Sequence, residues 1–143
     1  MRRRAILALG LLLGAQAAAQ DLPPGVTAED RTAIQGVIRR QLDAFQADDA
    51  AGAYAMAAPN IKKMFPTPDG FLAMVQRGYL PVYRPKSSDF SELALRDGEL
   101  VQEVELVGPD GRPVLALYTM QKDPGGVWVI AGCALIPSAR LGA

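Results

Sequence analysis

The stretch that decides the fold is residues 99–122, ELVQEVELVGPDGRPVLALYTMQK, in which two apolar runs flank the turn sequence Pro109-Asp110-Gly111. The freedom of the glycine backbone and the fixed proline ring favour a turn at this tripeptide. Outward from it, Asp97-Gly98 precedes the first run and Asp123-Pro124-Gly125-Gly126 follows the second. These turn signals predict four hairpin-linked strands in an antiparallel meander, near residues 88–96, 99–107, 113–122 and 127–136.

The N-terminal half has the periodicity of helices instead. Thr27 can cap a first helix, with Asp30 supporting the free N–H groups of its first turn. Apolar residues then recur every three or four positions and predict one buried stripe, formed by Ile34, Val37, Ile38, Leu42 and Phe45.

Two further helices are expected before the sheet. An Ala-rich helix capped by Asp48 or Asp49 should end before Pro59, because the proline ring disfavours helical geometry in the preceding residue. Residues 60–65 form either one more helical turn or an irregular stretch. Thr67-Pro68-Asp69 starts another helix, which Gly78 can end. The aromatic and proline-rich segment 78–85 is expected to be extended.

The chain therefore has the pattern of an α+β fold, with N-terminal helices packed on a curved four-stranded antiparallel meander. The last two strands are apolar on both faces, so their second face needs a cover. That surplus leaves two interpretations open, namely a sheet curved around a pocket and a homodimer interface. The predicted domain spans residues 29–137, between a leader at 20–28 and a tail at 138–143.

Residues 1–19 have the order of a secretory signal peptide. Arg2, Arg3 and Arg4 precede an apolar run that ends in small residues, and Ala17 and Ala19 suit cleavage after Ala19, with cleavage one residue later as the alternative. The run is shorter than the roughly 20 residues that span a bilayer. These features predict a periplasmic or secreted protein without a stable membrane anchor after cleavage.

Composition excludes several function classes. Cleavage removes three Arg and no acid from 15 basic and 15 acidic residues, leaving a formal charge of about −3, which argues against a nucleic-acid partner. The chain contains no His, the commonest metal ligand and acid-base group. Its single cysteine, Cys133, cannot form a disulfide within the chain. We therefore expect no metal and no cofactor.

Three segments carry a resemblance to a known family. Residues 77–85, RGYLPVYRP, together with residues 116–120, ALYTM, and 128–133, WVIAGC, resemble an exported bacterial family, domain of unknown function 4864. The opening helices and the meander also resemble the nuclear transport factor 2-like superfamily, which includes ketosteroid isomerase and the polyketide cyclases. The resemblance implies a cone-shaped fold. None of the superfamily's catalytic positions can be matched to residues of this chain.

Aromatic residues and one arginine are the candidate pocket residues. Tyr79, Tyr83 and Arg84 could orient a polar group of a ligand beside an apolar pocket, and packing over the edge of the core is the alternative. Tyr54, Tyr118 and Trp128 could line the same pocket or belong to the core or an interface.

Other polar residues have simpler interpretations. An excess of basic residues between 60 and 86 could attract an anionic ligand, although a merely solvated face is the simpler explanation. These residues are Lys62, Lys63, Arg77, Arg84 and Lys86. Cys133 is expected to be a small buried residue on the strand face of Val129, Ala131 and Leu135. Glu103 and Glu105 alternate with apolar residues and are expected to face solvent.

These features favour a non-catalytic periplasmic binding or accessory domain with an apolar pocket for a small ligand. The alternative is a lyase, isomerase or hydrolase acting on a small apolar substrate, in which a Tyr hydroxyl works with a carboxylate. A structural homodimer is the third hypothesis. No catalytic residue can be assigned from the sequence.

Overall fold

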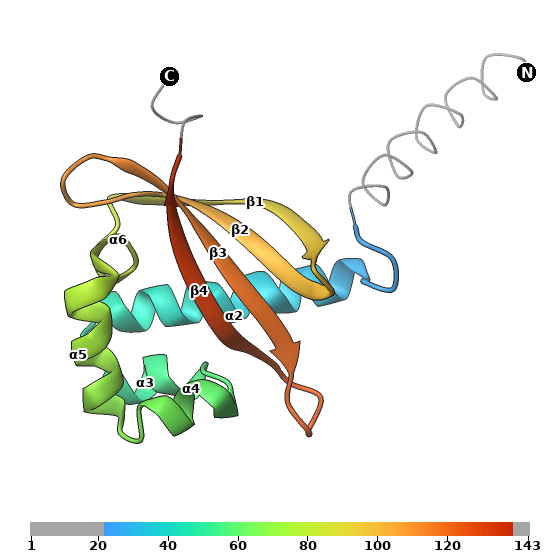
Figure 1. The fold of residues 1–143 in the computed structure, drawn as a ribbon, viewed down its shortest axis with the longest axis horizontal. Helices are drawn as coiled ribbons and strands as arrows, with labels where there is room; N and C mark the ends of the chain where they lie inside the picture. The colour runs from blue at the N-terminus through green and yellow to red at the C-terminus, as the bar shows by residue number, and fades with distance from the viewer. Residues whose placement is uncertain (1–21, 139–143) are drawn as a thin grey trace, which may run out of the picture.

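The computed structural model describes residues 22–138, and in this range five helices precede a single antiparallel sheet (Figure 1). The helices are α2 (Ala28–Gln46), α3 (Ala50–Ala55), α4 (Pro59–Met64), α5 (Pro68–Gly78) and α6 (Leu80–Tyr83). The strands are β1 (Ser87–Arg96), β2 (Glu99–Val107), β3 (Pro113–Lys122) and β4 (Trp128–Pro137), and each pairs with the next. The predicted α+β class and four-stranded meander are confirmed. The predicted signal peptide and residues 139–143 of the predicted tail lie outside the described residues.

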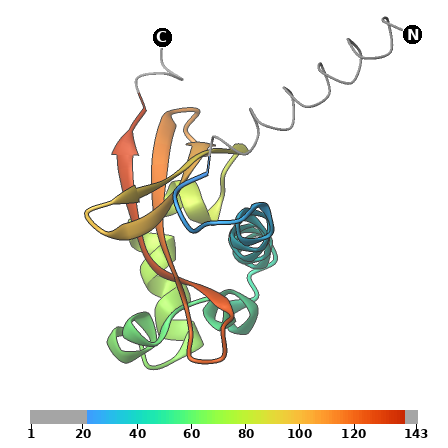
Figure 2. The ribbon, with the colours of Figure 1, turned by 90° about the vertical axis from the view of Figure 1, so that its right-hand side faces the viewer.

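Helix α2 forms because both of its predicted determinants are present. The Thr27 hydroxyl accepts a hydrogen bond from the Asp30 N–H at 3.0 Å, and the Asp30 carboxylate accepts one from the Thr27 N–H at 3.0 Å. This reciprocal pair satisfies two N–H groups that the helix itself cannot. All five residues of the predicted stripe are buried, and α2 crosses one face of the sheet (Figures 1 and 2). Within residues 22–138, none of the helices combines the length and apolarity needed to cross a bilayer.

The short helices α3 and α4 are attached to the edge of β4. Asp49 caps α3, and the chain then passes β4 in a short parallel bridge between Ala57 and Ile130. The Ala58 N–H donates to the Ile130 carbonyl at 2.8 Å, and the Ile130 N–H donates to the Met56 carbonyl at 2.9 Å. These bonds satisfy part of an otherwise open sheet edge and fix α4 beside β4.

One predicted conformation is wrong. Residues 78–85, which we expected to be extended, contain the one-turn helix α6. The Tyr79 carbonyl accepts from the N–H groups of Val82 and Tyr83, at 2.9 and 3.0 Å. Pro81 lies in the first turn, where its missing N–H costs no hydrogen bond. The turn redirects the chain between α5 and the sheet.

The predicted strand face of Cys133 also requires correction. Tyr118 pairs with Cys133 and Met120 pairs with Ile130, so β4 has an irregularity that places an extra residue, Ala131, between these two pairs. Paired residues of antiparallel strands share a face. Cys133 therefore faces the core with Ile130 and not with Val129, as alternation in β4 alone had suggested.

Glu103 is the third correction. It was expected to face solvent, but it is only 5% exposed on β2. Arg96 donates to its carboxylate, and the Ser91 hydroxyl donates at 3.3 Å. Partners on the neighbouring strand β1 thus compensate for the burial of a charge that alternation alone would have placed in water.

Candidate functional site

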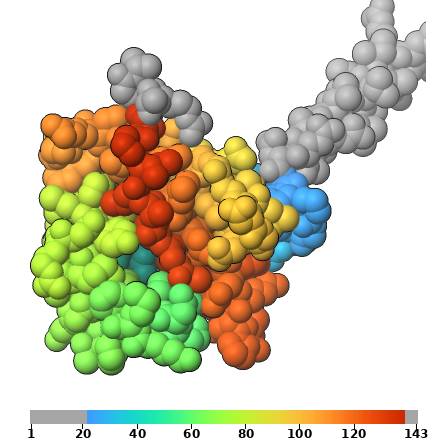
Figure 3. Space-filling model, in the orientation of Figure 1, coloured from blue at the N-terminus to red at the C-terminus, as the bar shows by residue number. Residues whose placement is uncertain are grey.

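A pocket of about 220 Å³ opens between the α4–α5 layer and the last two strands. Figure 3 shows this hollow between the green helices and the red β4, with α2 visible at its floor. Helix α2 supplies Gln41 and Phe45, and β3 supplies Tyr118. The other lining residues come from α4 to α6 and from β4: Asn60, Ile61, Met64, Phe65, Phe71, Met74, Val75, Tyr79, Val82, Ile130, Ala131, Gly132 and Cys133.

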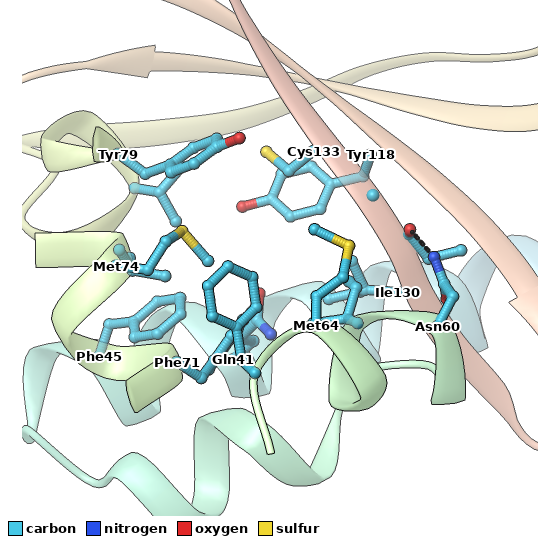
Figure 4. Close-up of a pocket in the computed structure, with 16 residues that line it drawn as sticks. Gln41, Phe45, Asn60, Met64, Phe71, Met74, Tyr79, Tyr118, Ile130 and Cys133 are labelled. Atoms are coloured by element: carbon cyan, nitrogen blue, oxygen red, sulfur yellow. Dashed lines mark hydrogen bonds between the residues drawn. The ribbon is translucent and has the colours of Figure 1, made fainter. Parts of the chain in front are cut away.

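The walls of the pocket are aromatic and thioether side chains. The Phe71 ring lies 6.1 Å from that of Phe45 and 6.3 Å from that of Phe65, measured between centroids, which is the tilted or edge-on packing that aromatic rings prefer. In Figure 4 Met64 and Met74 lie on opposite sides of the space that the labelled side chains surround, and Met64 is 69% exposed. Such unbranched side chains adapt to irregular shapes. The site is therefore suited to an apolar molecule.

Tyr118 places one polar atom in this apolar surround. The residue is 1% exposed, and among the buried side-chain polar atoms of residues 22–138 its hydroxyl alone lacks a hydrogen-bond partner. In Figure 4 the Tyr118 and Tyr79 hydroxyls and the Cys133 sulfur point toward the same space. Buried polar groups nearly always have partners. The hydroxyl of Tyr118 is therefore an open hydrogen-bonding position inside the pocket.

Both ionisable groups in the buried part of the pocket are held neutral. Burial raises the pKa of the Tyr118 phenol well above its ordinary value, and the adjacent Cys133 raises it further. Burial likewise raises the pKa of the Cys133 thiol to about 12, against a smaller opposing effect of Tyr118. The Cys133 thiol lies close enough to shift the pKa of the Tyr118 phenol, but a thiol is only a weak hydrogen-bond partner and does not satisfy the hydroxyl. At neutral pH the site therefore presents a phenol and a thiol, both protonated.

The structure brings two of the six predicted pocket residues, Tyr79 and Tyr118, to the lining. Tyr54 lies outside it, where its hydroxyl donates to the Phe65 carbonyl at 2.7 Å. Trp128 is also outside, and its indole N–H donates to the Asp30 carboxylate at 3.4 Å. These two aromatic residues hold neighbouring segments in place.

Tyr83 and Arg84 belong to a separate surface network with Asp48, which is here named the Asp48 network. The Arg84 guanidinium donates to both Asp48 carboxylate oxygens at 3.0 Å and to the Phe45 carbonyl at 2.5 Å. The Tyr83 hydroxyl donates to Asp48 and accepts from Gln76 at 3.1 Å. Hydrogen bonding from Tyr83, followed by that from Arg84, lowers the pKa of Asp48. The network joins the end of α2 to α5 and α6.

Charged residues are missing from the pocket. None of its 16 lining residues is acidic or basic. Of the predicted basic cluster, Arg84 pairs with Asp48, and the Lys62 ammonium lies 5.2 Å from the centroid of the Tyr54 ring. Across residues 22–138, no group of three or more His, Cys, Asp or Glu side chains could hold a metal ion. The geometry thus favours neutral ligands.

Sequence reasoning missed Gln41, which is 4% exposed at the pocket floor. Its amide donates to the Ala53 carbonyl at 3.1 Å and ties α2 to α3. A signal for it existed, because Gln41 lies four residues after Val37 and four before Phe45, within the buried stripe. A polar residue at a stripe position indicates a buried polar contact. Asn60 and Met64 carry no comparable signal.

Comparison with known proteins decides the family. The model of the family described as domain of unknown function (DUF4864) matches residues 27–143. The chain belongs to this family. The match includes every described element of the DUF4864 domain from α2 to β4, and hence the whole pocket. The search of curated proteins found no match, and neither did the search of solved structures.

Proposed function

We propose that this DUF4864 protein is an exported, non-catalytic domain that binds a small, mainly apolar molecule in the pocket between α4, α5 and β4. The observation that carries the proposal is the lining itself: an apolar concavity of about 220 Å³ with few polar atoms and no charged side chain. Ligand sites in proteins are typically concave, mostly apolar and furnished with a few placed polar groups.

The fold supports the proposal. Helices followed by a four-stranded antiparallel sheet agree with the cone expected of the nuclear transport factor 2-like superfamily, in which we place this chain. The bridge between Ala57 and Ile130 holds the α3–α4 segment beside β4, and the irregularity at Ala131 turns Cys133 toward the pocket. Backbone hydrogen bonds therefore fix the position of α4 relative to β4 on this side of the pocket.

The arrangement of carboxylates favours binding over catalysis. An enzyme of the predicted alternative class needs a carboxylate within hydrogen-bond reach of a Tyr inside the pocket. Tyr83 does contact the Asp48 carboxylate, but neither residue lines the pocket, and the Asp48 side chain is 56% exposed. The pKa of Asp48 is lowered, whereas a general acid requires a raised one. The contact between Tyr83 and Asp48 therefore has a structural role, which is to join the end of α2 to α6.

Ligand binding can be tested by thermal shift with toluene, cyclohexane and 1-hexanol. A ligand that binds only the folded state, at 100 times its Kd, stabilises that state by about 2.7 kcal/mol. We expect at least one of these molecules to raise the Tm of the wild-type protein. An unchanged Tm with all three would contradict the proposal.

A matched pair of variants locates the binding. Cys133→Phe places a ring in the pocket, whereas Ala134→Phe places the same ring on the next residue of β4, which is exposed. We expect the first variant to abolish the ligand-induced Tm shift and the second to retain it. If Cys133→Phe does not fold, NMR chemical-shift changes in the wild-type protein should map to Tyr118 and Ile130. Changes elsewhere would oppose the assignment.

Export is tested separately. The full chain, produced in a Gram-negative host, should appear in the periplasmic fraction or the medium and begin at Gln20 by intact mass. A cut one residue later agrees with the same mechanism. A protein that keeps Met1 and stays in the cytoplasm would refute the proposed location.

Self-association stays a prediction. The outward face of the sheet carries Ile136, which is exposed, paired with Leu115. Sedimentation velocity over a range of concentrations should detect a dimer if this face is its interface. Strictly monomeric behaviour would exclude the homodimer hypothesis.

A further inference from the structure

The buried Tyr118 hydroxyl has no internal role that the structure can show. Tyrosines such as Tyr54 and Tyr83 use their hydroxyls to bond other parts of the chain. Tyr118 is more deeply buried than either and makes no such bond. A phenylalanine would fill the same volume without leaving a polar atom unpaired. An unpaired buried hydroxyl lowers the stability of the fold, so its presence suggests a hydrogen-bond partner from outside the chain.

The surroundings define what that partner can be. We propose that the pocket takes an uncharged molecule, of about the size of a benzene ring with a short substituent, whose carbonyl oxygen accepts a hydrogen bond from the Tyr118 hydroxyl. This inference rests on the proposed function, and it names the ligand class of the same site.

The size follows from the volume. An apolar cavity of about 150 Å³ is known to hold benzene. This pocket, at about 220 Å³, has room for such a ring and a few more atoms, and it is smaller than the roughly 300–1,000 Å³ of sites for drug-sized molecules. The rings packed around Phe71 and the unbranched, adaptable side chains of Met64 and Met74 suit a flat apolar molecule.

The neutral acceptor follows from the charges. The lining holds no Lys or Arg that could compensate a carboxylate, and burying an unpaired anion is costly. The raised pKa values of Tyr118 and Cys133 keep both groups protonated at neutral pH, so the phenol remains available as a donor. A neutral carbonyl oxygen can accept that hydrogen bond without bringing a charge into the site.

Three molecules of nearly equal shape separate these requirements. Acetophenone has a carbonyl group between its ring and its methyl group, and ethylbenzene has a methylene group at the same place. Benzoate carries an anionic carboxylate at neutral pH. Isothermal titration calorimetry on the wild-type protein should give acetophenone a Kd roughly 3- to 10-fold lower than that of ethylbenzene, the ratio expected for one hydrogen bond. Benzoate should bind more weakly than both. Tighter binding of benzoate would overturn the inference.

Tyr118→Phe removes only the donor. We expect this variant to bind ethylbenzene as well as the wild type does, and to lose the preference for acetophenone. The matched control is Tyr54→Phe, which also removes one tyrosine hydroxyl. Tyr54 is half-buried and does not line the pocket. This control variant should keep the preference. A role of Tyr118 in packing alone would leave the ratio of the two Kd values unchanged in Tyr118→Phe.

The outcomes distinguish this inference from the proposed function. If acetophenone and ethylbenzene bind equally, and Tyr118→Phe changes neither, the pocket binds apolar molecules and the carbonyl class is wrong. If none of the three molecules binds, and the panel of toluene, cyclohexane and 1-hexanol also fails, the proposed function falls and the inference falls with it.

Discussion

Tyr83 and Tyr118 use the same functional group in opposite ways. The Tyr83 hydroxyl lies in the Asp48 network, where it donates to Asp48 and accepts from Gln76. The Tyr118 hydroxyl lies in the pocket and has no partner among the described residues. The first group is accounted for by the architecture of the chain, and the second is not. The comparison teaches that the unpaired phenol, rather than the better connected one, marks the candidate ligand site.

Phe45 joins the two regions, and its removal should have the largest effect. Its ring lines the pocket, while its carbonyl accepts from Arg84 in the Asp48 network. Phe45→Ala removes the ring and keeps the carbonyl, so it should lower the free energy of unfolding by about 3–5 kcal/mol, the usual cost for a buried Phe. Urea unfolding checks this value. The control Phe90→Ala, at a half-buried position, should lower the free energy of unfolding by less. An equal loss would show that Phe45 contributes no more to stability than a half-buried Phe does.

Tyr118→Phe should have the next largest effect, and in the opposite direction. Removing an unpaired buried hydroxyl should raise the free energy of unfolding of the unliganded protein by about 1 kcal/mol. Chemical denaturation without added ligand measures it. A loss of stability would mean that the hydroxyl has a stabilising partner, and the contrast between the two tyrosines would fail.

Tyr83→Phe should destabilise the protein modestly. It removes one hydrogen bond to Asp48 and one from Gln76, and these bonds are partly exposed, so the expected loss is about 0.5–1 kcal/mol. Tyr79→Phe is the control, because the structure gives the Tyr79 hydroxyl no hydrogen bond within residues 22–138, and its stability should match that of the wild type. Equal losses in both variants would remove the distinction between the network and the pocket.

The smallest effect concerns pH. Because the folded-state pKa of Asp48 lies below its ordinary value of 3.8, the ionised group stabilises the fold above that value. This stabilisation is lost as the pH falls below about 3.8 toward the lowered pKa. A plot of Tm against pH should therefore fall less steeply in this acid range for Asp48→Asn than for the wild type. Parallel curves would indicate that Asp48 is not coupled to folding.

Much of the fold could be predicted because local signals coincide with it. Thr27 and the stripe from Ile34 to Phe45 define α2, and the glycine-containing turns delimit all four strands. The prediction of an extended segment at 78–85 was wrong because Pro81 is compatible both with extended backbone and with the first turn of a helix. Packing of the segment between α5 and β2 decides which of the two conformations it adopts, and no local sequence pattern indicates that packing.

The pocket was harder to predict than the fold. Alternation in β3 could place Tyr118 on a strand face, but whether its hydroxyl meets a partner depends on α4 and α5, which are distant in sequence. The irregularity at Ala131 is likewise a property of the pairing with β3, since the residues Ala131-Gly132-Cys133 carry no distinctive signal of it. Tyr83 and Arg84 were predicted to lie beside the pocket, but they bind Asp48, which is 35 and 36 residues away in the sequence and which no local pattern connects to them.

The extra residue in β4 keeps Cys133 on the face of Ile130 although the two residues are three positions apart. Side chains of a regular strand alternate between the two faces of the sheet, so an uninterrupted strand would place Ile130 and Cys133 on opposite faces. Deleting Ala131 would restore regular alternation and leave Ile130, Gly132 and Cys133 opposite their present partners Met120, Thr119 and Tyr118. Deleting both Ala131 and Gly132 would instead turn Cys133 outward, so relatives that keep this wall of the pocket should be shorter here by one residue and not by two.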